Sequence, residues 1–197
     1  MIQIGVISQL QVQPESLKHG ERPFRTYDPS GLCVVPALRL TPNGIIGLQD
    51  TWQEILDIHH TDHPRSRNRQ INGISFMFTT QYDTLQKRFG PHATPGIAGE
   101  NILVHSEYTL SLADLTHGVL IRTDEGDILL NNIAPIAPCA PFSRFMLSMS
   151  EDPPAWLMKE TLQFLENGRR GFYGLVTETA VVRTGNPVFL PTNNKPD

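Results

Sequence analysis

The sequence predicts a mainly β protein with a few helices, folded as a closed barrel or as a pair of packed sheets. The first observation is a series of nine short apolar segments, rich in β-branched residues and separated by turn residues. The second is that only three segments have apolar residues at helical spacing. A parallel sheet covered by helices needs strands that alternate with helices, so this pattern disfavours it.

The predicted strands are short and follow one another at close intervals. One pair is joined by the sequence TDEGD at residues 123–127, which is typical of a hairpin turn. Neighbouring strands joined in this way run antiparallel, and an antiparallel-rich barrel is therefore expected. The nine predicted strands are residues 2–7, 32–40, 71–78, 101–104, 119–123, 128–133, 172–177, 180–183 and 187–190.

Two helices are predicted in the first half of the chain. At residues 51–56, Thr51 and Glu54 have the spacing of a capping box, and the apolar residues between and after them share one helical face. The second helix is predicted at residues 80–89, where aromatic and aliphatic residues recur on one side, and Gly90 ends it.

A third helix is predicted near the end of the chain. Asp152 is its expected N-cap, Pro153 occupies the first helical position, and Gly168 ends it. No internal repeat interrupts the pattern, so residues 1–197 are expected to form a single domain. The last residues, 192–197, are polar and are expected to form a flexible tail.

Composition excludes several classes of protein. Hydrophobic residues make up 39% and charged residues 18%, and the net charge of −4 argues against a nucleic-acid or anionic-membrane partner. No apolar run approaches the ~20 residues that span a bilayer. Residues 1–9 lack the features of a secretory signal, so a cytoplasmic location is expected.

The two cysteines, Cys33 and Cys139, are expected to be reduced in that compartment. Cys139 is the more interesting of the two, because prolines at 135, 138 and 141 make its segment a stiff loop. Arg144 is near enough in sequence to favour a reactive thiolate, which is the nucleophilic and metal-binding form. The alternative is that Cys139 is a small buried apolar residue, and spacing does not separate the two.

The histidines at 59, 60 and 63 form a second candidate cluster. On a helix, His59 and His63 would share one face, as in a zinc pair. Pro64 follows directly and no third ligand is evident, so a polar loop without zinc is the preferred interpretation. The arginines at 65, 67 and 69 form either a solvated charge run or an anion-binding rim.

A glycine-rich segment, GIAGEN at residues 96–101, precedes a predicted strand. It lacks the lysine and hydroxyl residue of a phosphate-binding P-loop and does not begin a helix, so nucleotide binding is not supported. From the residues alone, Glu100 and Asn101 are equally well explained as turn-forming residues.

Five stretches together resemble the MOSC domain family. The run GIAGENILV at 96–104 resembles its GxxGENL motif, and APC at 137–139 resembles its cysteine loop. NGRRGFYGLV at 167–176 resembles GRxGxYxxV, and VVRTGNPV at 181–188 resembles the closing GxVxxGDxV, with Asn186 in place of the aspartate. Upstream, HPRSRNRQI at 63–71 resembles the region with a family histidine. The resemblance is strongest over residues 40–190.

This resemblance implies a distorted closed β-barrel that binds molybdenum cofactor (molybdopterin) through a loop cysteine. Cys139 would be the catalytic residue, as the metal ligand or sulfur carrier. The reaction implied is either reduction of N-hydroxylated substrates or sulfur transfer, and it needs a separate redox or sulfur-donor protein. Polar and basic residues would line or support the cofactor pocket, namely His63, Arg69, Glu100, Asn101, Arg144, Arg169 and Arg170.

Two other functions remain open from the sequence. The same barrel can serve as a non-catalytic module that binds a small molecule or a protein, or it can be purely structural, because a fold does not determine a function. The pair Arg169 and Arg170 is expected to matter more to an anionic ligand than to folding.

Overall fold

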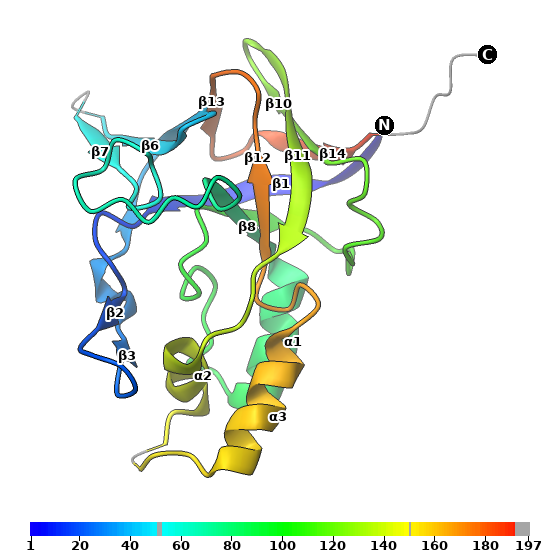
Figure 1. Ribbon diagram of the computed structural model, residues 1–197. Coiled ribbons are helices and arrows are strands. Elements are labelled where there is room, and N and C mark those ends of the chain that lie inside the picture. Colours follow the sequence, from blue (N-terminus) through cyan, green and yellow to red (C-terminus); the bar gives the residue numbers. More distant parts are fainter. Residues whose placement is uncertain (51–52, 150, 192–197) are drawn as a thin grey trace.

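The computed structural model describes residues 1–50, 53–149 and 151–191, which form a closed seven-stranded barrel, a smaller sheet and three helices (Figure 1). The predicted mainly β fold is therefore confirmed. The predicted tail at 192–197 and the predicted helix start at Thr51 lie outside the described residues. None of the described helices is long and apolar enough to cross a membrane.

The barrel closes because one long strand pairs on both of its sides. β1 (Ile2–Val12) pairs with the final strand at its beginning and with β9 further on, and bulges near Gly5 and Ser8 bend it. All neighbours are antiparallel except β8 and β9. Around the barrel the order is β14 (Pro187–Leu190), β10 (Val119–Thr123), β11 (Gly126–Pro135), β12 (Phe172–Leu175), β8 (Ile74–Phe78), β9 (Ile102–His105) and β1.

A smaller sheet and a short hairpin flank the barrel. The hairpin consists of β2 (Lys18–His19) and β3 (Thr26–Tyr27), and β4 (Cys33–Val34) extends the barrel sheet beside β1. A single 3₁₀ turn, Pro29–Gly31, connects β3 to β4 among the described residues. The smaller sheet has the order β13 (Ala180–Arg183), β5 (Ala37–Thr41), β6 (Gly44–Leu48) and β7 (Glu54–Leu56).

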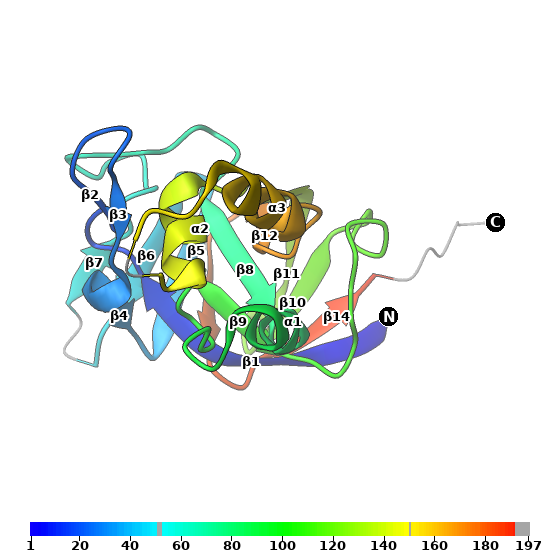
Figure 2. The same cartoon turned by 90° about the horizontal axis from the view of Figure 1, so that it is seen from below.

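Three helices lie together at one end of the barrel, as Figures 1 and 2 show from the side and from below. They are α1 (Thr79–Phe89), α2 (Ala140–Leu147) and α3 (Ala155–Leu165). Strand β8 separates two apolar cores, since Phe76 and Phe78 face the barrel interior while Met77 packs with Phe142 and Leu165 of the helices. This two-sided burial explains why every residue of β8 is buried.

Every predicted strand overlaps an observed one, and the predicted hairpin turn joins β10 to β11. The predicted strand at 32–40 is divided into β4 and β5, with Pro36 between them, because proline lacks the N–H that a strand ladder needs. The helix predicted at residues 80–89 is confirmed as α1, with Gly90 at its C-cap.

Two helix predictions and the extent of one predicted loop need correction. The segment predicted as a helix at 51–56 contains β7, where Glu54 pairs with Leu48 of β6, because sheet hydrogen bonds outweigh a capping pattern. The stiff loop predicted around Cys139 is observed at residues 136–139, but it ends at Ala140, where α2 begins, because proline is tolerated in a first helical turn. Helix α3 begins at Ala155 rather than Pro153, since Asp152 pairs with Arg144 at 3.3 Å and does not cap it.

Candidate functional site

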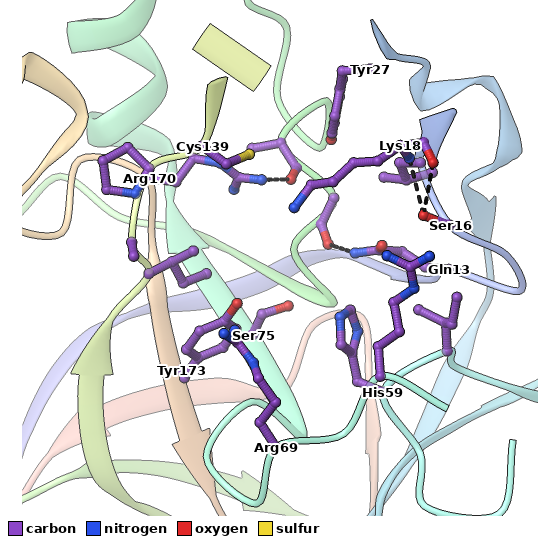
Figure 3. Close-up of a pocket in the computed structure, with 18 residues that line it drawn as sticks. Gln13, Ser16, Lys18, Tyr27, His59, Arg69, Ser75, Cys139, Arg170 and Tyr173 are labelled. Atoms are coloured by element: carbon purple, nitrogen blue, oxygen red, sulfur yellow. Dashed lines mark hydrogen bonds between the residues drawn. The ribbon is translucent and has the colours of Figure 1, made fainter. Parts of the chain in front are cut away.

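A cavity of about 250 Å³ opens where the β2–β3 hairpin, the loop from β7 to β8 and the beginning of α2 meet (Figure 3). These segments are far apart in the sequence, and the barrel closure brings them together. The cavity is lined by Gln13, Ser16, Leu17, Lys18, Tyr27, Ile58, His59, Arg67, Arg69, Ser75, Ala98, Gly99, Ile136, Ala137, Pro138, Cys139, Arg170 and Tyr173.

Cys139 lies on one wall of this cavity and its backbone is firmly held. The chain leaves β11, and the Ile136 N–H donates to the Gly171 carbonyl at 2.9 Å. Cys139 is then the N-cap of α2, where its carbonyl accepts a bond from the Ser143 N–H at 3.0 Å. Its side chain makes no capping bond, and the half-buried thiol therefore remains directed at the cavity (Figure 3).

Arg170 shares the wall of Cys139 and is held from two sides. Its guanidinium stacks over the ring of Phe142 at 4.1 Å, and its Nη2 donates to the Ala98 carbonyl at 2.6 Å. Only 8% of the residue is exposed. A buried, stacked guanidinium loses little freedom when it binds an anion, so Arg170 is preorganised for that role.

The opposite wall comes from the loop between β7 and β8. Its backbone is folded back on itself, because the Arg67 N–H donates to the Ile58 carbonyl at 2.7 Å and the Asn68 amide donates to the His59 carbonyl at 2.6 Å. The Arg69 N–H is bonded to the Asn72 side chain at 2.7 Å. These bonds direct His59, Arg67 and Arg69 to the cavity without any regular secondary structure.

The electrostatic character of the lining is strongly positive. Four side chains with permanent positive charge line the cavity, Lys18, Arg67, Arg69 and Arg170, and no carboxylate of a described residue is in the lining. The whole chain carries a net charge of −4, so the charge of the cavity lining is opposite in sign to the net charge of the protein. Such a lining attracts anions, and phosphate or oxyanion groups suit guanidinium forks.

A buried polar network supports the wall that carries His59. The Asp57 carboxylate is fully buried and accepts hydrogen bonds from the N–H of Gln13 at 2.8 Å and from the Asn101 amide at 2.8 Å. Burial raises the pKa of Asp57, but bonds from His59 and Gln13 outweigh burial and hold that pKa below its ordinary value. Asn101 also accepts from Ser75 Oγ at 2.7 Å, which ties β8 to the same network.

A second buried acid lies behind the wall that carries Arg170. Glu100 accepts a hydrogen bond from the Tyr82 hydroxyl, 2.8 Å from each carboxylate oxygen. Burial raises the pKa of Glu100, and the bond from Tyr82 and the charge of Arg170 offset this only in part. Tyr27, which lines the cavity, has a pKa raised by burial, and its hydroxyl donates to the Ile97 carbonyl at 2.8 Å.

The predicted site residues fall into three groups. Cys139, Arg69 and Arg170 line the cavity, and Glu100 and Asn101 lie directly behind its walls. The other three predicted residues lie outside the cavity lining, and each contacts another part of the chain. They are His63, with Nε2 2.9 Å from the Pro14 carbonyl, Arg144, which donates to the Pro23 carbonyl, and Arg169, which stacks on Phe164.

Several lining residues are not among the cofactor-binding residues that the sequence predicts. His59 was one of three candidate histidines, and Arg67 belongs to the alternating arginines, so both had a signal in the sequence. Lys18 and Tyr27 had none, because they belong to two-residue strands of a hairpin that only the fold brings over the cavity.

Solved structures of other proteins resemble this chain in fold. The YuaD protein of Bacillus subtilis superposes with a TM-score of 0.53 at 15% identity, over 92% of this chain and 96% of that chain. YiiM of Escherichia coli superposes with a TM-score of 0.50 at 18% identity, over 81% of this chain and 65% of that chain. At these identities the similarity shows the fold alone.

No protein of curated function matches the chain. The family model of the MOSC domain matches residues 61–189. This match covers well over half of the chain, and it includes Cys139, Arg170 and most of the loop that carries the arginines. The motifs in the sequence, the closed barrel and the family model agree, and the protein therefore belongs to the MOSC domain family.

Proposed function

We propose that the cavity binds molybdenum cofactor or a transferable sulfur atom, with Cys139 as the residue that bonds to the metal or carries the sulfur. One observation carries the proposal: a half-buried thiol opens on a cavity whose lining, in the part of the chain that the structure describes, has four permanent positive charges and no carboxylate. A thiolate is a ligand for soft metals and a carrier of persulfide sulfur. The charges suit an anionic phosphate group.

The donor set around Cys139 fits a metal that is carried by a cofactor. Among the described residues, no three His, Cys, Asp or Glu side chains are grouped so that they could hold a metal ion. A metal bonded to Cys139 must therefore bring its other ligands with it. When bound, the cofactor would supply two-electron redox chemistry, while Lys18, Arg67, Arg69 and Arg170 would hold its anionic group.

Two reaction classes fit a cavity of this kind. Reduction of an N-hydroxylated substrate takes up two electrons and two protons, breaks the N–O bond and releases water, and a separate redox protein must supply the electrons. Sulfur transfer passes the outer sulfur of a Cys139 persulfide to an acceptor and leaves the Cys139 thiolate. In both, the chain's own residues bind and orient the anion and hold the thiol at the cavity wall.

Replacement of Cys139 by serine tests this proposal. Protein purified from cells that make the cofactor should contain molybdenum and pterin, or a persulfide on Cys139, and Cys139→Ser should lose them, because a hydroxyl is a poor ligand for a soft metal. The variant should stay folded, since serine at an N-cap can bond to the free N–H groups of α2. Metal analysis, pterin fluorescence and intact-mass spectrometry measure these outcomes.

Cys33→Ser is the matched control, because Cys33 is also half-buried but lies in β4 and does not line the cavity. It should keep the full cofactor or sulfur content. If Cys139→Ser retains as much as the parent protein, the cysteine has no role in binding. A non-catalytic binding module on the same barrel would then be the better description.

A further inference from the structure

His59 and Asp57 form a hydrogen-bonded pair whose free end faces the cavity. The Nδ1 atom of His59 lies 2.9 Å from Oδ1 of Asp57, and the His59 backbone N–H donates to the same oxygen at 2.8 Å. The Asp57 side chain is fully buried, whereas about a fifth of the His59 side chain is exposed (21%). Figure 3 shows the His59 ring directed into the cavity, on the side opposite Cys139.

The hydrogen bonds around Asp57 fix which nitrogen of His59 exchanges a proton. The Asp57 carboxylate is ionised, since its pKa lies below the ordinary value, and it accepts rather than donates at Oδ1. Nδ1 therefore carries a hydrogen in either charge state of the ring. The proton that is gained or lost when the ring changes charge is then on Nε2, which has no hydrogen-bond partner among the described residues.

The charged and titratable groups that face the imidazole come from every side of the cavity. Asp57 lies behind it, Arg67 and Arg69 follow on the same loop, and Lys18 comes from the hairpin. Across the cavity are Cys139, Arg170 and the hydroxyls of Tyr27 and Tyr173.

We propose that His59 is a proton-carrying group of the anion site: it binds the anionic part of the ligand as an imidazolium, through Nε2–H, and so couples ligand binding to proton uptake. Asp57 acts through His59 as a positioning residue. The proposal rests on the anion-binding wall of the proposed function but does not depend on the chemistry at Cys139. It gives the pocket a proton that is available at the ligand, which both proposed reaction classes can use.

Sulfate binding at two pH values tests the proposal, because sulfate stays a dianion throughout and adds no proton of its own. All variants carry Cys139→Ser, so that Cys139 cannot contribute to the measured pH dependence. From about pH 8 to about pH 5.5, the range over which histidine gains its charge, affinity should rise about tenfold or more, the effect expected of one added charged hydrogen bond. Chemical-shift titration by NMR measures weak binding of this kind.

His59→Asn is the decisive variant, since the asparagine amide can keep the bond to Asp57 but does not titrate. Its sulfate affinity should be the same at both pH values. Asp57→Asn should reduce the pH dependence, because a neutral amide stabilises the imidazolium less than a carboxylate does. His63→Gln is the matched control and should behave like the parent, because His63 bonds to the Pro14 carbonyl outside the cavity.

The remaining outcomes separate this inference from the proposed function. If the parent binds sulfate equally well at both pH values, or if His59→Asn keeps the full rise, then His59 is not the proton-carrying group, although the anion site survives. If sulfate does not bind at either pH, the positively charged wall is not an anion site and both proposals are contradicted.

Discussion

Two adjacent arginines have different surroundings in this protein. Arg169 is exposed, stacks on Phe164 at 4.9 Å and donates to the Phe164 carbonyl at 2.7 Å. Arg170 is buried, packs against Phe142 and holds the backbone of Ala98 at the cavity. The sequence pattern predicted one role for both, as ligand-binding residues of little importance to folding. In the structure the two residues differ, because Arg170 is buried and Arg169 is exposed.

Arg170→Gln is therefore expected to lower the free energy of unfolding by about 2 kcal/mol or more, because it removes a desolvated cation–π contact and a charged hydrogen bond. Arg169→Gln should cost under about 1 kcal/mol, because the same contacts at an exposed site are weak. Urea denaturation measures both. Equal losses in the two variants would contradict the distinction drawn from burial.

Sulfate affinity provides a second comparison of the same two variants. Arg170→Gln should weaken binding, since Arg170 lines the cavity, and Arg169→Gln should leave it unchanged. A weaker affinity in Arg169→Gln alone would mean that the anion binds elsewhere on the protein.

At the scale of elements, helices α2 and α3 are packed together with buried hydroxyls that have no partner. Ser143 of α2 and Thr161 of α3 are both fully buried, and neither side-chain oxygen has a hydrogen-bond partner among the described residues. A buried hydroxyl without a partner costs about 1–3 kcal/mol. The two hydroxyls therefore lower the stability of the helix pair that carries Cys139 at the N-cap of α2.

Ser143→Ala and Thr161→Val should each leave stability unchanged or raise it by up to about 1 kcal/mol, since each removes a desolvated hydroxyl at almost constant volume. The control is Ser106→Ala. Ser106 is also buried, but its Oγ accepts a bond from the Tyr108 N–H at 3.1 Å, so its loss should destabilise the protein. If all three variants are destabilised alike, the two helical hydroxyls have partners in solution.

For the whole molecule, two buried acids make opposite contributions to stability as the pH changes. The pKa of Asp57 is lowered in the folded state, so its contribution is present above about pH 3.9 and is lost as the pH falls through the folded pKa. Burial raises the pKa of Glu100, so its contribution is greatest below about pH 4.3 and is lost as the pH rises through the folded pKa.

Glu100→Gln should remove the second of these effects. The free energy of unfolding of the parent should decrease above about pH 4.3, and that of the variant should decrease less, because glutamine has no proton to lose. At neutral pH the variant should be at least as stable as the parent. Urea denaturation at a series of pH values measures both curves.

Glu125→Gln is the control for this series, because Glu125 is exposed in the hairpin turn between β10 and β11. Its curve should follow that of the parent. The opposite result would be a free energy of unfolding that increases from about pH 4.3 to neutral pH in the parent but not in Glu100→Gln. It would show that the Glu100 carboxylate is stabilised in the folded state, contrary to the expected direction.

The strands and the family were determined by local sequence. Alternating and β-branched segments marked every barrel strand, since side chains of a strand face opposite sides of a sheet whatever the partner. The GIAGENILV and NGRRGFYGLV runs identified the family, and Gly90 correctly ended α1. Where local signals competed, as at β7 and α2, the sheet partner or the packing of the helix decided the outcome.

The composition of the cavity was decided only by the tertiary structure. Lys18, His59, Arg67 and Arg170 are separated by up to most of the chain length, and barrel closure between β1 and β14 brings their segments around Cys139. Whether an arginine lines the cavity or lies against the surface depends on long-range contacts, such as the one between Arg170 and Phe142. A sequence motif shows which residues are present. Only tertiary packing determines where a side chain points and how far it is removed from water.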